Sequence, residues 1–196
     1  KRINVFGNHA FNNDKILKVI KSRKKWLFNS GYLKEELLEE DMGRVSSFYE
    51  QNGFIDITSK YEVEYLNSGL VEVTLTIDEG KRYYVGNLKV NGTSVVSEKE
   101  VEKSMEGVKQ GGIFSREKLT ADLANIRTLY FDKGYIFANV NESTALDPDT
   151  GKVDIDIAIE EGSVAYIEKV KIQGNTRTRD IVIRRELKMY PGDKFD

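Results

Sequence analysis

The sequence predicts an α+β protein made of tandem β-α-α-β-β copies, each a three-stranded mixed sheet with two helices on one face. Three observations support this fold class. A strand with a glycine turn occurs three times, an amphipathic helix occurs twice, and a pair of alternating strands follows each of those helices. A repeat of about 80 residues in a chain of 196 predicts two complete copies and the start of a third.

The first element of each copy is a strand of alternating apolar and polar residues that ends in a glycine turn. The three segments are Ile3–Asn8, Leu88–Thr93 and Val170–Asn175. Their glycines are 85 and 82 residues apart, which is the first sign of a regular repeat.

A short helix is expected after each of these strands. In the first copy it is predicted over Asn13–Lys21. In the second copy Ser97 and Glu100 have the spacing of a capping box. In the third copy Thr178 is expected to cap a helix that runs through Leu187.

The second helix is predicted by apolar residues at i, i+4, i+7 and i+11, which lie on one helical face. They are Leu38, Met42, Val45 and Tyr49 and, 81 positions later, Leu119, Leu123, Ile126 and Tyr130. Asp41 maps onto Asp122 at the same offset, and Gly53-Phe54 maps onto Gly134-Tyr135. Both glycines sit where a helix C′ residue adopts a left-handed conformation.

Two further strands complete each copy, and residues typical of turns connect them. They are predicted over Ile57–Tyr65 and Leu70–Ile77 in the first copy, and over Phe137–Ser143 and Val153–Ile159 in the second. Their strict alternation predicts one buried and one solvent-facing side.

The copies are expected to be joined by very short links. The predicted boundaries are 1–80, 81–162 and 163–196, with hinges at Gly80, Lys81, Gly162 and Ser163. Because the sequence starts within a strand and stops inside the third copy, it is interpreted as a piece of a longer protein.

Composition narrows the function. Lys plus Arg is 30 against Asp plus Glu 32, and this near-neutral balance argues against a dedicated nucleic-acid-binding domain. The absence of cysteine excludes disulfides and thiolate chemistry and fits an oxidising compartment, while a single histidine, His9, excludes a multi-histidine metal site. No apolar run reaches the roughly 18–20 residues that span a bilayer.

No motif predicts catalysis or a cofactor. The carboxylate pairs Glu39/Glu40 and Glu160/Glu161 fit a solvated helix face and a copy boundary better than acid–base chemistry. The glycine-rich stretch Gly107–Gly112 lacks the Gly-Lys-Ser/Thr ending of a phosphate-binding loop. We therefore expect neither an enzyme nor a bound nucleotide or metal.

Two basic groups leave an alternative open. One contains Lys21, Arg23, Lys24 and Lys25 before Trp26-Leu27-Phe28, and the other contains Arg177, Arg179, Arg184 and Arg185. Either group could contact phosphate, although solvated helix faces are the simpler interpretation. The apolar trio at 26–28 is expected either to pack inside its copy or to face a neighbour.

Edge strands are the strongest candidates for a binding site. An exposed edge carries unpaired N–H and C=O groups that can accept an extended peptide as an added strand. The residues predicted to do this are Ile57, Thr58, Ser59, Tyr61 and Val63 in the first copy and Asn139, Val140 and Asn141 in the second.

The repeat resembles the polypeptide-transport-associated (POTRA) domain. The resemblance rests on the Gly-Asn turn and on the motif Tyr-x-x-x-Gly-aromatic, present at Tyr49–Phe54 and Tyr130–Tyr135. Gly92-Thr93 departs from the Gly-Asn pattern. Within arrays of outer-membrane β-barrel assembly factors, the copies look like modules three, four and the start of five.

The resemblance implies a periplasmic scaffold that belongs to an outer-membrane protein. It implies binding of unfolded outer-membrane proteins and accessory outer-membrane lipoproteins, a membrane-embedded carboxy-terminal barrel outside this sequence, and neither nucleic acid nor a cofactor. Two alternatives remain: the POTRA region of a related secretion or import translocator, and a tandem βααβ nucleic-acid-binding protein.

Overall fold

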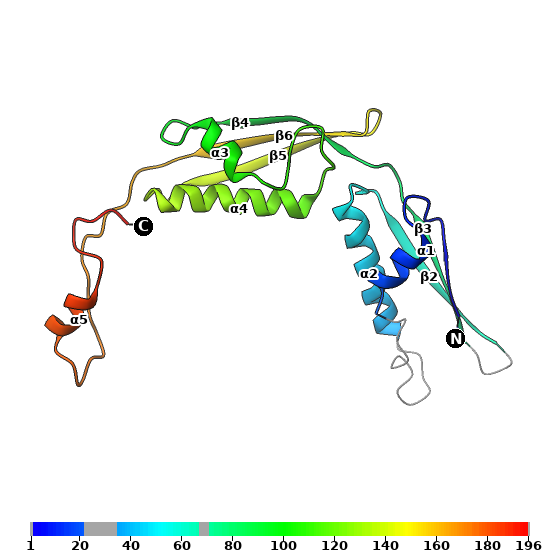
Figure 1. Cartoon of the computed structure of the whole chain (residues 1–196), viewed down its shortest axis with the longest axis horizontal. Coiled ribbons are helices and arrows are strands. Elements are labelled where there is room, and N and C mark those ends of the chain that lie inside the picture. Colours follow the sequence, from blue (N-terminus) through cyan, green and yellow to red (C-terminus); the bar gives the residue numbers. More distant parts are fainter. Residues whose placement is uncertain (1, 22–34, 67–70, 196) are drawn as a thin grey trace. The chain divides into compact units, whose positions relative to one another are not determined.

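The computed structural model describes residues 2–21, 35–66 and 71–195. Within them lie six strands and five helices, and those of the first two copies follow the predicted order (Figure 1). The α+β class and the β-α-α-β-β order of the first two copies are confirmed. The trio at 26–28 and the basic residues Arg23, Lys24 and Lys25 lie outside the described residues.

The first copy contains a mixed sheet with the strand order β1-β3-β2. Its strands are β1 (Arg2–Phe6), β2 (Thr58–Tyr65) and β3 (Val71–Asp78). β1 runs parallel to β3, with Val5 opposite Leu75, and β2 runs antiparallel to β3, with Tyr61 opposite the same leucine. β1 and β2 are therefore the two edges of this sheet.

The second copy repeats the same order, β4-β6-β5. Its strands are β4 (Tyr84–Asn91), β5 (Asn139–Asp147) and β6 (Lys152–Glu160). β6 alternates between exposed residues and the buried Val153, Ile155, Ile157 and Ile159. The one buried side predicted from the alternation is therefore confirmed for β6, and β6 is the central strand, with β4 and β5 as the edges.

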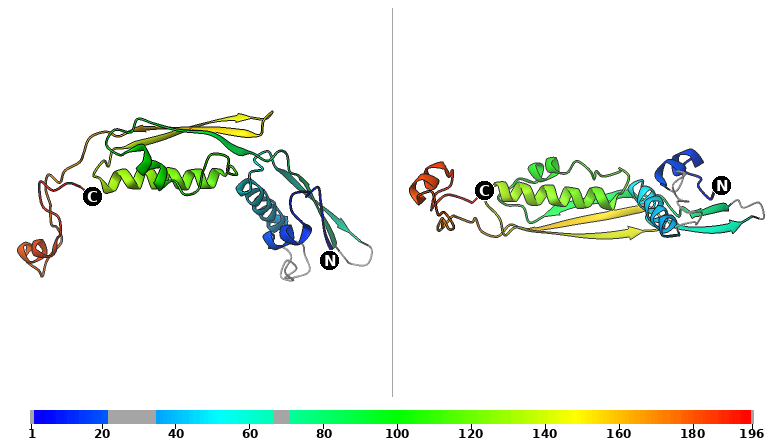
Figure 2. Two further views of the ribbon diagram at one scale, coloured as in Figure 1. Left: turned by 45° about the horizontal axis from the view of Figure 1, so that its top comes forward. Right: turned by 90° about the horizontal axis from the view of Figure 1, so that it is seen from below.

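The helices are α1 (Asn13–Val19), α2 (Glu35–Gln51), α3 (Glu98–Ser104), α4 (Arg116–Asp132) and α5 (Asp180–Glu186). Two further views show α1 and α2 on one face of the first sheet (Figure 2). The Asn12 side chain caps α1, and Ser97 and Glu100 form the predicted capping box of α3.

The core of the first copy lies between its sheet and its helices. Leu38, Val45 and Tyr49 of α2 are at most 1% exposed, and Met42 is buried beside them. The strands contribute Val5, Val73, Leu75 and Ile77, and α1 and its end contribute Ile16 and Ile20. Phe11 packs edge-on against Phe48, Tyr49 and Phe54. The helical periodicity at 38–49 therefore marked the buried face.

The third copy differs from the expectation in two ways. The strand predicted at Val170–Gln173 does not form, because residues 163–195 contain no counterpart of β3 or β6 with which it could pair. The helix cap predicted at Thr178 is wrong: the N-cap residue is Arg179, without a side-chain bond. Asn175 Nδ2 instead donates to the Thr178 carbonyl and to Asp180 Oδ1, which fixes the turn before α5.

The chain divides into two compact units, and the first copy lies in the first unit together with residues 81–87, 108–119 and 144–154. None of the described helices combines the length and the apolar character needed to cross a bilayer.

Candidate functional site

The edge strand β2 holds most of the binding residues predicted for the first copy. Thr58, Ser59, Tyr61 and Val63 lie in β2, and Ile57 precedes it by one residue. Tyr61 and Val63 are half-buried against the core, whereas Thr58 is exposed. This alternation leaves one face of β2 in solvent beside a free strand edge.

The edge strand β5 holds the residues predicted for the second copy. Asn139 and Asn141 are exposed, and the side chain between them, Val140, is 1% exposed. Both strands therefore lie where an added strand could pair with the backbone. Whether a peptide binds at either edge stays a prediction.

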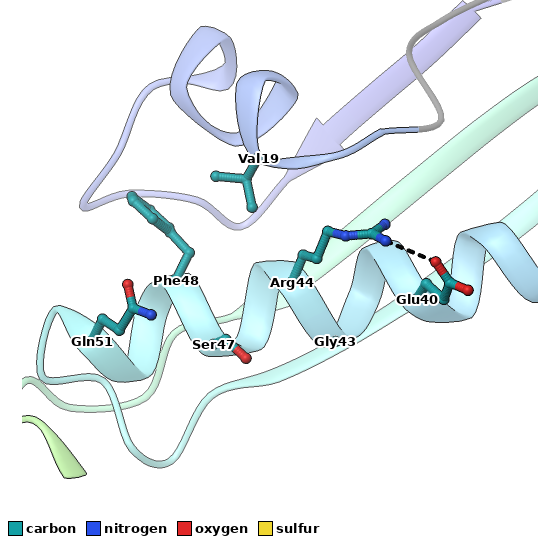
Figure 3. A pocket seen from close by; sticks show the side chains of 7 residues that line it. All are labelled: Val19, Glu40, Gly43, Arg44, Ser47, Phe48 and Gln51. Atoms are coloured by element: carbon teal, nitrogen blue, oxygen red, sulfur yellow. Dashed lines mark hydrogen bonds and ion pairs between the residues drawn. The ribbon is translucent and has the colours of Figure 1, made fainter. Parts of the chain in front are cut away.

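A groove of about 560 Å³ runs between α1 and α2 (Figure 3). Val19 of α1 faces it, together with Gly43, Ser47, Phe48 and Gln51 of α2. At one end Arg44 forms an ion pair with Glu40, with 2.7 Å between Nη2 and Oε2. An aromatic ring beside an ion pair suits a surface contact better than a reaction.

Two buried aspartates occupy equivalent positions in the two long helices. Asp41 accepts a hydrogen bond from the backbone N–H of Lys21 at 2.8 Å. Asp122 Oδ1 accepts from the N–H groups of Glu106 and Gly107 at 3.0 and 2.9 Å. Each aspartate therefore ties its long helix to the segment after the short helix, and the 81-residue offset between them was the only signal in the sequence.

A tyrosine and a glutamate connect the end of each copy to its beginning. Tyr49 donates to Glu79 at 2.8 Å, and Glu79 also accepts from the backbone N–H of Ala10. In the second copy Tyr130 donates to Glu161 at 2.9 Å. Glu161 also accepts from the backbone and the hydroxyl of Ser94 and from the N–H of Val95.

These contacts shift the acidity of both partners in the second copy. Burial raises the pKa of Glu161, but the hydrogen bonds from Ser94, Val95 and Tyr130 outweigh it, and the pKa falls to about 2. Burial, and then the hydrogen bond to Glu161, raises the pKa of Tyr130. The Glu160/Glu161 pair, which the sequence suggested as a boundary marker, therefore contains a structural carboxylate.

The lowered pKa of Glu161 predicts a pH-dependent stability. The folded-state pKa lies below the usual 4.5, so the charged carboxylate stabilises the second copy above about pH 4.5 and loses this effect as the pH falls towards 2. Glu161→Gln should therefore be less stable than the unsubstituted chain at pH 7, and the difference should shrink at pH 2.5. Urea unfolding followed by the NMR signals of Ile155 and Ile157 measures it.

Glu160→Gln is the control for this experiment, because Glu160 is exposed and adjacent in sequence. Its stability difference should stay small at both pH values. A difference for Glu161→Gln that is unchanged between pH 7 and pH 2.5 would contradict the role of the charged carboxylate.

The glycines of the Tyr-x-x-x-Gly-aromatic motif have a second role that the sequence did not reveal. Within the first compact unit, the N–H of Tyr83 donates to the carbonyl of Gly53 at 2.8 Å. Within the second, the N–H of Ala165 donates to the carbonyl of Gly134 at 2.9 Å. A Cβ at Gly53 would lie 2.8 Å from Ile113 Cγ2, so the close approach requires glycine as much as the helix end does.

The predicted hinges have mixed surroundings. Gly80 and Gly162 both have positive φ, +63° and +66°. A Cβ at Gly80 would lie 2.9 Å from the Cβ of Asp56, and the ammonium of Lys81 donates to the carbonyl of Pro148. Motion at these positions, and at Ser163, stays a prediction.

The remaining candidates lie apart from one another. His9 is exposed in the loop after β1, and Glu39 and Glu40 are exposed on α2. The basic residues near α5 are also solvent-facing, with Arg184 donating to the carbonyl of Val170 at 3.2 Å. Among the described residues, no three His, Asp or Glu side chains are grouped to hold a metal ion.

Comparison with known proteins gives consistent matches. The sequence model of the POTRA family, described as a surface antigen variable number repeat, matches residues 1–80, 83–162 and 165–196. The chain is 29% identical over 175 residues to an outer membrane protein assembly factor BamA from Nitratidesulfovibrio vulgaris, covering 87% of this chain and 22% of that protein. It is 28% identical over 197 residues to BamA from Neisseria meningitidis, covering 97% and 25%.

Among solved structures, the crystal structure of Haemophilus influenzae BamA POTRA3-5 has a TM-score of 0.64 at 18% identity. The similarity covers all of this chain and 78% of that one, and it supports the fold. The chain spans only about a quarter of the length of the curated relatives that it matches.

Proposed function

The chain belongs to the POTRA family, and from this premise we propose that it is the periplasmic part of an outer-membrane protein assembly factor. In this proposal it binds unfolded outer-membrane proteins by strand addition at β2 or β5 and also provides surfaces for accessory outer-membrane lipoproteins. The proposal involves no catalytic step. The observation that carries it is the pair of solvent-facing edge strands at equivalent places in two copies of the fold.

The physical basis is the unpaired backbone of an edge. An extended peptide gains main-chain hydrogen bonds along the edge without requiring one particular sequence, which suits clients that share only alternating β-strand patterns. On β2 the exposed Lys60, Glu62 and Glu64 alternate with half-buried residues. Such charges discourage pairing between copies of the same chain while leaving the backbone accessible to another peptide.

The names of the relatives favour assembly over the alternatives. Both relatives compared above are assembly factors, which supports this role over that of a secretion or import translocator. The nucleic-acid alternative rests on the exposed arginines near α5, but the net charge of the chain is −2. Binding to RNA or DNA that weakens with added salt would be needed to support the nucleic-acid alternative.

A titration tests the proposal directly. The ¹⁵N-labelled chain is titrated with a peptide that carries the alternating pattern of an outer-membrane β-strand, and amide chemical shifts are followed. We expect shifts along Thr58–Tyr65 or Asn139–Asp147, because strand addition changes backbone hydrogen bonding at the edge.

The matched control peptide has a proline at its centre, which removes one N–H and disrupts strand pairing. It should produce much smaller shifts at the same residues. Shifts confined to the arginines near α5, or shifts of equal size with both peptides, would contradict strand addition.

A further inference from the structure

The two candidate edges differ at one pair of equivalent positions. Residues 46 and 59 of the first copy correspond, at the offset of 81, to residues 127 and 140 of the second. In the first copy both are serines, Ser46 on α2 and Ser59 on β2, and their hydroxyl oxygens are 3.3 Å apart. In the second copy the positions hold Arg127 and Val140.

Arg127 reaches from α4 to the backbone of the edge strand. Its Nη2 donates a hydrogen bond to the carbonyl oxygen of Val140 at 2.8 Å. The arginine is half-buried, so part of its stem is packed rather than free in solvent. Figure 1 shows α4 running along β5, which explains how a helical side chain reaches that strand.

A second arginine of α4 also reaches β5. Arg116 Nη2 lies 3.3 Å from the hydroxyl oxygen of Thr144, further along the same strand. The first copy has no equivalent contact: across the described part of the chain, no side chain is hydrogen-bonded to the backbone of β2. As far as the described residues go, β2 is therefore the less obstructed of the two edges.

An added strand needs the backbone groups of the edge as partners, and a guanidinium already bonded there competes with it. Hydrogen bonds from a charged donor are stronger than neutral ones, so displacing the arginine opposes strand addition. The serine pair of the first copy joins two side chains and leaves the backbone of β2 untouched.

We infer that Arg127 closes the β5 edge to an added strand, so that β2 is the edge that accepts it. This inference rests on the proposed function and makes it more specific, because it assigns the client strand to one copy. A single residue on the helix, rather than the sheet itself, then decides which copy binds.

The test uses the whole ¹⁵N-labelled chain and the alternating strand peptide described above. In the unsubstituted chain, shifts should appear over Thr58–Tyr65 and not over Asn139–Asp147. In Arg127→Ser the second range should also respond, with an affinity at least about tenfold higher at β5 than in the unsubstituted chain. Lys118→Ser, which removes an exposed cation from the same helix, should behave like the unsubstituted chain.

A reciprocal variant, with the opposite change at the equivalent position of the first copy, separates the effect of the arginine from a folding defect. Ser46→Arg places an arginine at the equivalent position of α2 and should weaken binding at β2 about tenfold. The inference is overturned if the β5 amides of Arg127→Ser show no chemical-shift changes while those of β2 do. It is also overturned if the β5 amides shift as strongly as those of β2 in the unsubstituted chain. Absence of shifts at both edges in every protein instead overturns the proposed function.

Discussion

Replacing Gly92 by alanine should destabilise the second copy by about 3 kcal/mol. Gly92 directly follows β4 and has φ at +83°, a left-handed conformation that disfavours any residue with a Cβ. A Cβ there would also overlap the carbonyl oxygen of Ile159 on β6, so the backbone of the central strand would have to move. Native-state hydrogen exchange of the β6 amides measures the loss in free energy of unfolding.

The chain supplies its own control for this substitution. Gly174 has the same φ of +83° in the third copy, but no atom lies within 4 Å of the position its Cβ would take. Gly174→Ala should therefore raise the free energy of the folded chain by only about 1 kcal/mol, from the backbone conformation alone. It should leave the hydrogen exchange of the β6 amides unchanged. Equal effects of the two substitutions would show that the contact with Ile159 carries no energy.

Replacing Asp122 by alanine should also lower the free energy of unfolding by about 3 kcal/mol, for a different reason. Asp122 is 1% exposed and accepts the backbone N–H groups of Glu106 and Gly107. Without the carboxylate these two part-buried donors lose their shared partner. Thermal unfolding and faster exchange of the amides of Glu106 and Gly107 are the measurements.

Two variants separate this effect from a general effect on the helix. Asp122→Asn keeps one acceptor oxygen, so the free energy of unfolding should fall by only about 1 kcal/mol. Asp132→Ala removes an exposed aspartate from the end of the same helix and should have almost no effect. If Asp132→Ala matched Asp122→Ala, the hydrogen bonds to the backbone would not be the cause.

The regular parts of the fold were predictable because they depend on periodicity. Leu119 and Tyr130 recur at helical spacing, and both are fully buried. The alternation at Val153–Ile159 predicted a strand with one buried side, as β6 has. Such patterns record which side of an element faces the core, and this is what decides a layered α+β fold.

The polar contacts were not predictable, because they join residues distant in the sequence. Tyr130 and Glu161 are 31 residues apart, and only folding brings the hydroxyl to the carboxylate. The bond from Arg127 to Val140 was missed for the same reason, since an arginine on a helix usually indicates only a solvated face. The repeat offset was the one usable signal, and it marked positions without giving their chemistry.

The third copy shows the limit of local patterns. Residues 170–173 alternate as well as the start of β1 does, yet they form no strand. A strand is stabilised by its neighbour, and the alternating pattern does not state whether that neighbour is available. Thr178 likewise has the side chain of a good cap. Its carbonyl oxygen, however, accepts a hydrogen bond from the Asn175 side chain, and the helix starts two residues later.

The tyrosine–glutamate contacts have a consequence for the order in which the copies can fold. In each copy the glutamate directly follows the last strand, and it binds the loop that follows the first strand. A copy therefore cannot complete its closing bonds until its final residues are available, but it needs no residue of the next copy to form them. As a chain becomes available from its amino terminus onwards, the copies can close one after another, each without its successor.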